Sequence, residues 1–147
     1  MPLSRRDLAM LLPALAAAQS SPAPALPSKV YHPGAYATDP NVGDSTMGTP
    51  TKKGRALMRG AEHSGFGLEV HETVLGPGTA THAPHKHVHD EMMFIIEGTA
   101  EALIEGKAER AESGSLVFYA SNQMHNLRNT GTTPCRYLVV ELRGKPA

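Results

Sequence analysis

The sequence GTATHAPHKHVHDEMMFIIEG occupies residues 78–98 and joins a dense histidine cluster to a short apolar run. The histidines cluster between His82 and His89, and the run that follows, Met92–Ile96, is apolar at every position. Residues two apart on an extended strand face the same side, so His85 and His87 are expected to point together toward the interior. This stretch therefore predicts a pair of inward-facing imidazoles next to a buried β-strand.

Glu91 keeps the parity of His85 and His87, but it follows an expected bend at residues 88–90. From the neighbouring strand its carboxylate can return toward the two imidazoles. A fourth ligand must then come from far along the chain, and His125 is the only later histidine. Three neutral imidazoles and one carboxylate suit one divalent transition metal, with Mn or Fe favoured and Zn, Ni or Cu also open.

The chain from Arg55 onward consists of short segments rich in Val, Ile, Leu, Phe and Tyr. Turn sequences that contain glycine separate these segments, for example Glu105-Gly106-Lys107. Regularly spaced short strands without an amphipathic helix between them predict an all-β sandwich or barrel. The expected strands cover residues 66–75, 92–97, 99–105, 115–119, 124–129 and 136–142.

Part of this region resembles the first sequence motif of the cupin family. His85, His87, Glu91 and Gly98 match that motif in its His-x-His, Glu and final Gly spacing. Gly78 departs from the pattern, because it lies one residue earlier than the leading glycine of the family.

A later segment resembles the second cupin motif. Gly114, His125 and Asn129 stand in register with the Gly, His and closing Asn of that motif. Ala120 and Asn122 replace the proline and glycine that the family places before the histidine. Asn tolerates a left-handed backbone nearly as well as Gly, so the turn at Asn122 is expected to survive.

The double resemblance implies a small single-domain cupin over residues 54–147, with the jelly-roll (double-stranded β-helix) barrel of that family and a metal inside. Likeness to cupin dioxygenases and oxidases implies a metal-dependent enzyme that oxidises a small organic molecule. Cupin lyases, isomerases and decarboxylases use similar ligands, so the reaction class stays open. The alternatives are a non-catalytic cupin that binds a sugar or organic acid, and a barrel in which the metal is purely structural.

Three further histidines lie near the expected site. His82 is interpreted as a residue of the pocket rim, with a role as proton shuttle near pH 7 as a hypothesis. His89 lies in the bend and is expected to be exposed. His71 alternates with Glu69 and Thr73 and is expected on a solvated face, whereas Phe66, Leu68 and Val70 form the opposite, apolar face. Inward parity from Glu91 and His125 predicts a mostly apolar pocket around the metal.

The first residues have the layout of an export signal. Arg5 and Arg6 precede a short apolar run and small residues, which resembles a twin-arginine signal over residues 1–18. Export to the periplasm or outside the cell is therefore expected, and a chain folded before export can load Mn or Fe inside the cell. Residues 19–53 are rich in Pro, Gly and Ser and form either a linker or an arm over the barrel.

Composition excludes several classes of function. The 14 basic residues equal the 14 acidic residues, so binding to nucleic acid is not expected. The apolar runs are too short for a membrane span in the mature chain. The single cysteine excludes an intramolecular disulfide. The continuous apolarity of Met92–Ile96 predicts that both faces of this strand are covered, by the arm or by a second chain, and it favours a homodimer.

Overall fold

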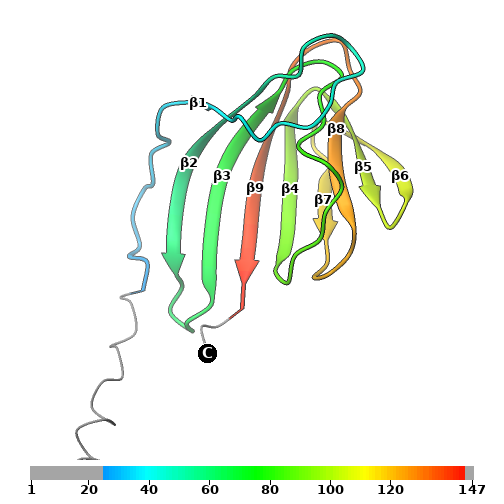
Figure 1. Ribbon diagram of the computed structural model, residues 1–147. Helices are drawn as coiled ribbons and strands as arrows, with labels where there is room; N and C mark the ends of the chain where they lie inside the picture. Colours follow the sequence, from blue (N-terminus) through cyan, green and yellow to red (C-terminus); the bar gives the residue numbers. More distant parts are fainter. Residues whose placement is uncertain (1–24, 145–147) are drawn as a thin grey trace, which may run out of the picture.

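The computed structural model describes residues 25–144, and these residues form two antiparallel sheets packed face to face (Figure 1). The expected jelly-roll architecture is confirmed. The expected export signal, residues 1–18, lies outside the described residues. Within residues 25–144, no helix has the length and apolarity that crossing a membrane requires.

Nine strands make up the two sheets in the described residues. They are β1 (Ala37–Thr38), β2 (Lys52–Ala61), β3 (Gly67–Leu75), β4 (Asp90–Glu97), β5 (Thr99–Ile104), β6 (Lys107–Glu112), β7 (Leu116–Tyr119), β8 (His125–Asn129) and β9 (Cys135–Arg143). The larger sheet has the order β1-β2-β3-β9-β4-β7, and the smaller sheet has the order β6-β5-β8. Strands adjacent in space are often distant in the chain, as β3 and β9 are, which is typical of a jelly roll.

The hydrophobic core lies between the two sheets. The larger sheet contributes Leu75, Met93, Ile95, Tyr137 and Val139, and the smaller sheet contributes Ala100, Ala102, Ala111 and Leu127. Small alanines on one sheet face large side chains on the other, so the two layers can approach closely.

The side chains of β4 alternate between buried and exposed positions, although its sequence is a continuous apolar run. Met93 and Ile95 are buried, whereas Phe94 is 43% exposed on the opposite face. Leu116 and Phe118 of the neighbouring β7 are also exposed there. The described part of the arm, residues 25–53, leaves Phe94 exposed and is not the cover expected for this face, and the homodimer stays a prediction.

Besides the two-residue β1, two strands lie outside the predicted segments. Strand β2 is polar at many positions and has half-buried residues throughout, because only the short β1 lies beyond it in the sheet. Strand β6 is almost entirely exposed at the edge of the smaller sheet. Neither strand shows the apolar alternation on which a sequence-based prediction depends.

The crossing segment, residues 76–89, leaves the larger sheet after β3, runs against β8 of the smaller sheet and returns to the larger sheet at β4. Ala80 forms an isolated bridge with Arg128, and His85 forms another with His125. The backbones of His85 and His125 exchange two hydrogen bonds of 3.1 and 2.8 Å. This crossing segment therefore places the histidine motif against the start of β8.

The turn before β8 has the backbone conformation expected from its sequence. Asn122 adopts a φ of +64°, which lies in the left-handed region, and the prediction that Asn can replace the family's glycine is confirmed. Its backbone N–H donates a 2.7 Å hydrogen bond to the carbonyl of His87. This turn thereby fixes the second histidine of the motif relative to β8.

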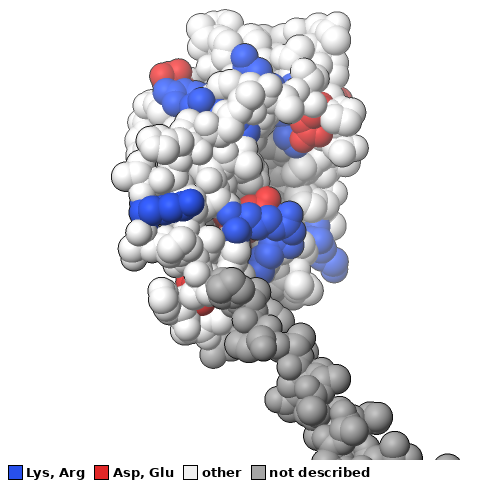
Figure 2. Space-filling view, turned by 90° about the vertical axis from the view of Figure 1, so that its left-hand side faces the viewer, with Lys and Arg blue, Asp and Glu red and all other residues white. Residues whose placement is uncertain are grey.

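Residues 25–51 run as a mostly irregular strap along the barrel (Figure 1). The backbone N–H of Gly43 donates to the carbonyl of Ala80, and Lys52 forms a 2.9 Å ion pair with Asp39. Figure 2 shows that basic side chains on the face over β1 and β2 lie in separate groups, some of them beside acidic side chains. Ion pairs and backbone hydrogen bonds thus hold the strap on the barrel.

We expect Gly98→Ala to lower the free energy of unfolding by about 3 kcal/mol or more. Gly98 has a φ of +87°, and an added Cβ would lie 2.8 Å from both the Cα of Cys135 and the carbonyl oxygen of Pro134. Urea unfolding monitored by circular dichroism measures this loss. Gly106 is the matched control, because it has a φ of +78° but open space around it. Gly106→Ala should cost only about 1–2 kcal/mol, and equal losses would contradict the steric argument.

We expect the thiol of Cys135 to be inert in the native protein. Cys135 has no exposed surface, and burial raises the pKa of its thiol to about 11. At pH 8 only about a thousandth of such a thiol is ionised, and the thiolate is the reactive form. A chromogenic disulfide reagent at pH 8 should label the urea-unfolded chain rapidly and the native chain very slowly. Equal rates in the two states would refute the buried position.

Candidate metal site

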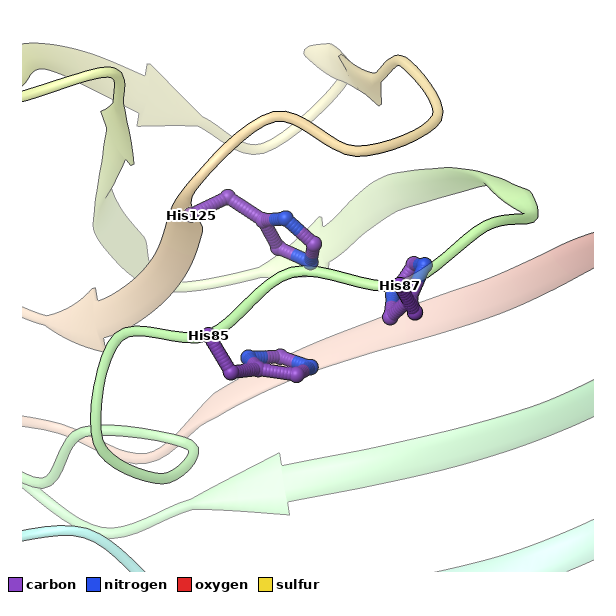
Figure 3. Close-up of side chains that lie close together, drawn as sticks. All are labelled: His85, His87 and His125. Atoms are coloured by element: carbon purple, nitrogen blue, oxygen red, sulfur yellow. The ribbon is translucent and has the colours of Figure 1, made fainter.

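Three histidines meet between the crossing segment and the start of β8 (Figure 3). His85 and His87 lie on the crossing segment, and His125 is the first residue of β8. One ligand atom from each of the three lies within 4.8 Å of the others. The ring centroids of His85 and His87 each lie 4.7 Å from that of His125. Two segments about 40 residues apart in the chain therefore converge on one point.

Each of the three rings has one buried nitrogen without a hydrogen-bond partner. Nδ1 of His87 contacts the carbonyl of His89 at 2.9 Å, and Nδ1 of His125 contacts the carbonyl of Gln123 at 2.8 Å. The buried Nε2 atoms of these two residues and the buried Nδ1 of His85 have no hydrogen-bond partner. A backbone carbonyl on one ring nitrogen fixes the other for a metal. The donors present therefore fit a metal ion.

Glu91 supplies a carboxylate beside His87, and its ligand atom groups within 4.8 Å with those of His87 and His89 rather than with those of His85 and His125. It lies at the start of β4, only 7% of it is exposed, and its Oε2 lies 3.5 Å from Nε2 of His87. Burial raises the pKa of Glu91 to about 7, and the nearby Glu141 contributes in the same direction. A buried carboxylate is costly to ionise unless a cation lies beside it, so this position favours a bound cation.

The electrostatics of the rings also suit metal binding. Burial, together with the neighbouring rings of His82 and His125, lowers the pKa of His85 to about 4. Burial lowers the pKa of His125 as well. These imidazoles are therefore neutral near pH 7, which is the form that coordinates a metal.

Tyr119 supports His125 from the core. Its ring stacks on the His125 ring at a centroid distance of 4.2 Å, and its hydroxyl donates a 2.8 Å hydrogen bond to the carbonyl of Asn126. Tyr119 has no exposed surface. The way Tyr119 faces follows from its register opposite Glu91 across β4 and β7, which the sequence alone does not give.

A cavity of about 220 Å³ opens beside the histidines. Thirteen residues line it: Lys52, His71, Thr73, Thr81, His82, His85, His87, His89, Glu91, Met93, Tyr137, Val139 and Glu141. Most of these side chains are polar, so the expectation of a mostly apolar pocket is wrong. His82 lies at this cavity, with its ring centroid 3.9 Å from that of His85.

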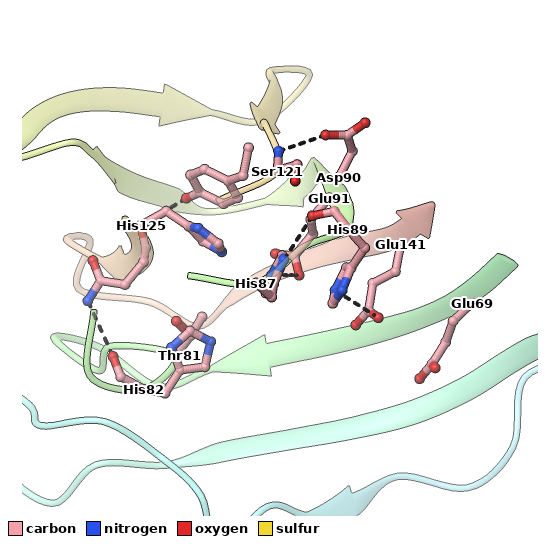
Figure 4. Close-up of polar contacts among 12 residues, drawn as sticks. Glu69, Thr81, His82, His87, His89, Asp90, Glu91, Ser121, His125 and Glu141 are labelled. Atoms are coloured by element: carbon pink, nitrogen blue, oxygen red, sulfur yellow. Dashed lines mark hydrogen bonds and ion pairs between the residues drawn. The ribbon is translucent and has the colours of Figure 1, made fainter. Parts of the chain in front are cut away.

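Two other histidines lie differently from the expectation. His89 is not exposed: its side chain is 15% accessible, it stacks on His87 at 3.6 Å, and its Nε2 lies 3.2 Å from Glu141 (Figure 4). His71 is not on a solvated face but lines the cavity, whereas Phe66 is 47% exposed. The inner face of β3 is polar here because it borders the cavity. Sequence reasoning therefore missed His71 and Glu141 as cavity residues.

Comparison of the sequence with known proteins finds a matching family model and curated relatives. Residues 71–141, about half the chain, match the family model described as a cupin domain. L-ectoine synthase of Bordetella parapertussis is 41% identical over 61 residues, which cover 40% of this chain and 44% of that protein. The match thus spans less than half the length of this curated relative.

Solved structures share the barrel. A structure from Thermotoga maritima described as a predicted oxalate decarboxylase has 25% identity and a TM-score of 0.57, and the alignment covers 68% of this chain and 89% of that one. An RmlC-like cupin from Shewanella frigidimarina has 17% identity and a TM-score of 0.53, with 70% and 83% covered. These likenesses support a small cupin barrel.

Proposed function

We propose that this chain is a small metal-dependent cupin enzyme that acts on a small polar molecule. His85, His87, Glu91 and His125 hold one divalent transition metal in this proposal, with Mn or Fe as the first choice. The observation that carries it is the convergence of three histidines, whose ligand atoms lie within 4.8 Å of one another and each of which has a buried ring nitrogen without a hydrogen-bond partner, beside a polar cavity that His85 and His87 line. A bound metal of this class supplies a Lewis acid or a redox centre.

The cavity residues then bind and orient the substrate. Thr73, Thr81 and Tyr137 offer hydroxyl groups at the cavity wall, and Met93 and Val139 offer apolar surface. A cavity of about 220 Å³ admits only a small molecule. His82 lies beside His85 at this cavity, and burial lowers the pKa of its ring, so it is neutral near pH 7 and able to accept a proton from the substrate.

Oxidation is the first reaction class, because three imidazoles and one carboxylate suit Fe(II) and Mn(II). A second candidate is a reaction without O₂, such as decarboxylation of a small acid. The Thermotoga maritima structure, 25% identical over 68% of this chain, favours it, because that protein is described as a predicted oxalate decarboxylase.

Elemental analysis of the untagged full chain, purified without chelator, tests the proposal first. Near one Mn or Fe per chain supports it, and metal-free native protein that takes up neither ion refutes it. The loaded protein is then incubated with small carboxylic acids and phenols, with and without O₂. Turnover that requires O₂ supports oxidation, and anaerobic release of CO₂ supports decarboxylation. Protein that binds these molecules without turnover supports the non-catalytic binding role instead.

A further inference from the structure

Three glutamates form a row across neighbouring strands of the larger sheet. Glu69 of β3 stands directly opposite Glu141 of β9, and Glu141 stands opposite Glu91 of β4. Their side chains are 22%, 12% and 9% exposed, respectively. Like charges directly opposite each other destabilise a sheet, so this row requires cations beside it. Figure 4 shows Glu69, Glu141 and Glu91 on adjacent strands.

The proposed metal site neutralises only Glu91, which is at one end of this row of glutamates. Glu91 lies beside His87, whereas Glu69 and Glu141 group with His71. Arg143 contacts both of these carboxylates, and Arg59 lies 3.4 Å from Glu69. The two arginine side chains are 44% and 74% exposed, and exposed ion pairs contribute little. The carboxylates therefore lack a strong cation on their buried side.

His71 lies on that buried side. It is two residues along β3 from Glu69, and one ligand atom each from Glu69, His71 and Glu141 lies within 4.8 Å of the others. Nδ1 of His71 is buried and has no hydrogen-bond partner, and it lies 4.0 Å from Oε1 of Glu69. This distance is too long for a hydrogen bond. Burial lowers the pKa of His71, so the ring does not supply the missing positive charge near pH 7.

We propose that Glu69, His71 and Glu141 form a second divalent-cation site at the same cavity. One imidazole nitrogen and two carboxylates are donors that Zn²⁺ accepts. An ion about 2.1 Å from each donor joins donors up to about 4.2 Å apart, so small side-chain adjustments bring the three into range. The cation binds the two carboxylates from their buried side and competes with Arg143, which contacts them from the exposed side.

His89 lies between this site and the proposed first site. Its ring stacks on that of His87, and its Nε2 lies 3.2 Å from Oε2 of Glu141. The second cation thus occupies the part of the cavity that His71 and Glu141 line, where a small anionic substrate would meet positive charge at two points. The second site stands on its own residues and does not depend on the reaction class proposed above.

Zinc stoichiometry of the full chain tests the proposal. The metal-free protein is dialysed against Zn²⁺, and bound zinc per chain is measured by elemental analysis. We expect about two zinc ions per chain for the unaltered protein, and a loss of one of them in both His71→Ala and Glu69→Gln. One zinc per chain in the unaltered protein would overturn the second site. Unchanged zinc content in His71→Ala, with a native circular dichroism spectrum, would also overturn it.

Further variants separate zinc at this second site from zinc at the first site and on the surface. His63 is exposed and lies on neither site, so His63→Ala should keep all the zinc; if it loses the same ion as His71→Ala, that ion is a surface ion and the proposal fails. His125→Ala should lose the other zinc, and adding His71→Ala to it should remove both. Arg143→Met should tighten binding of the second zinc several-fold, because it removes the competing guanidinium. Weaker binding in Arg143→Met would contradict the proposed competition.

Discussion

His125→Ala is expected to weaken metal binding at the proposed first site by more than about 100-fold, because mutation of residues that merely orient a ligand already costs about 10–100-fold. His125 is 1% exposed and is the one donor of that set contributed by the smaller sheet. Without it, His85 and His87 of the crossing segment and Glu91 of β4 remain, and no ligand faces them from the smaller sheet. The dissociation constant is measured for Mn²⁺ by competition with a chelator of known affinity.

His89→Ala is the control for this prediction. The His89 ring stacks on His87 and has a ligand atom within 4.8 Å of those of His87 and Glu91, but it does not group with His85 and His125, and its Nε2 lies 3.2 Å from Glu141. The orienting contact to His87 comes from the backbone carbonyl of residue 89, which alanine retains. His89→Ala should therefore keep the first metal, and full Mn²⁺ occupancy in His125→Ala would exclude the proposed ligand set.

The strands that sequence predicted are those that bury apolar side chains. The expected segments at residues 92–97 and 136–142 correspond to β4 and β9, which lie in the middle of the larger sheet. Strand β6 was missed because its edge position exposes most of its residues, and β2 was missed because its side chains are mostly half-buried and show no apolar alternation. Their pairing depends on backbone hydrogen bonds with neighbours, and the side-chain pattern carries little trace of it.

The site residues differ in the same way, because some are placed by the local strand pattern and others by pairing between distant strands. The parity of residues on an extended strand predicted that His85 and His87 face the same region, and the structure brings both together with His125. The facing of His71 was predicted wrongly, because the rule that apolar residues face inward fails where the interior is a polar cavity. Glu141 could not be found from the sequence, because its position depends on the register between β3, β9 and β4.

Tyr119 shows how strongly the core and the site depend on each other. This residue of β7 is fully buried, and it packs between the hydrophobic core and the ring of His125. Burial raises the pKa of its hydroxyl above the usual value, with the charge of Glu91 as a further cause, so the group remains a neutral donor. Its hydrogen bond to the carbonyl of Asn126 ties β7 to β8 directly behind the candidate metal site.

Tyr119→Ala should therefore lower the free energy of unfolding of the metal-free protein by about 3–5 kcal/mol, the range for removing a buried aromatic ring. Tyr119→Phe keeps the ring and loses one buried hydrogen bond, so it should cost about 1 kcal/mol. Urea unfolding in the presence of chelator measures both losses without a contribution from the metal.

Phe118 provides the matched control, because it is the preceding residue of the same strand but is 50% exposed on the outer face. Phe118→Ala should change the free energy of unfolding by no more than about 0.5–1 kcal/mol. The two alanine variants thus differ in which face of β7 they empty, not in the strand or the amount of ring removed. If Tyr119→Ala cost no more than Phe118→Ala, β7 would not pack against the core as described, and Tyr119 would not support His125.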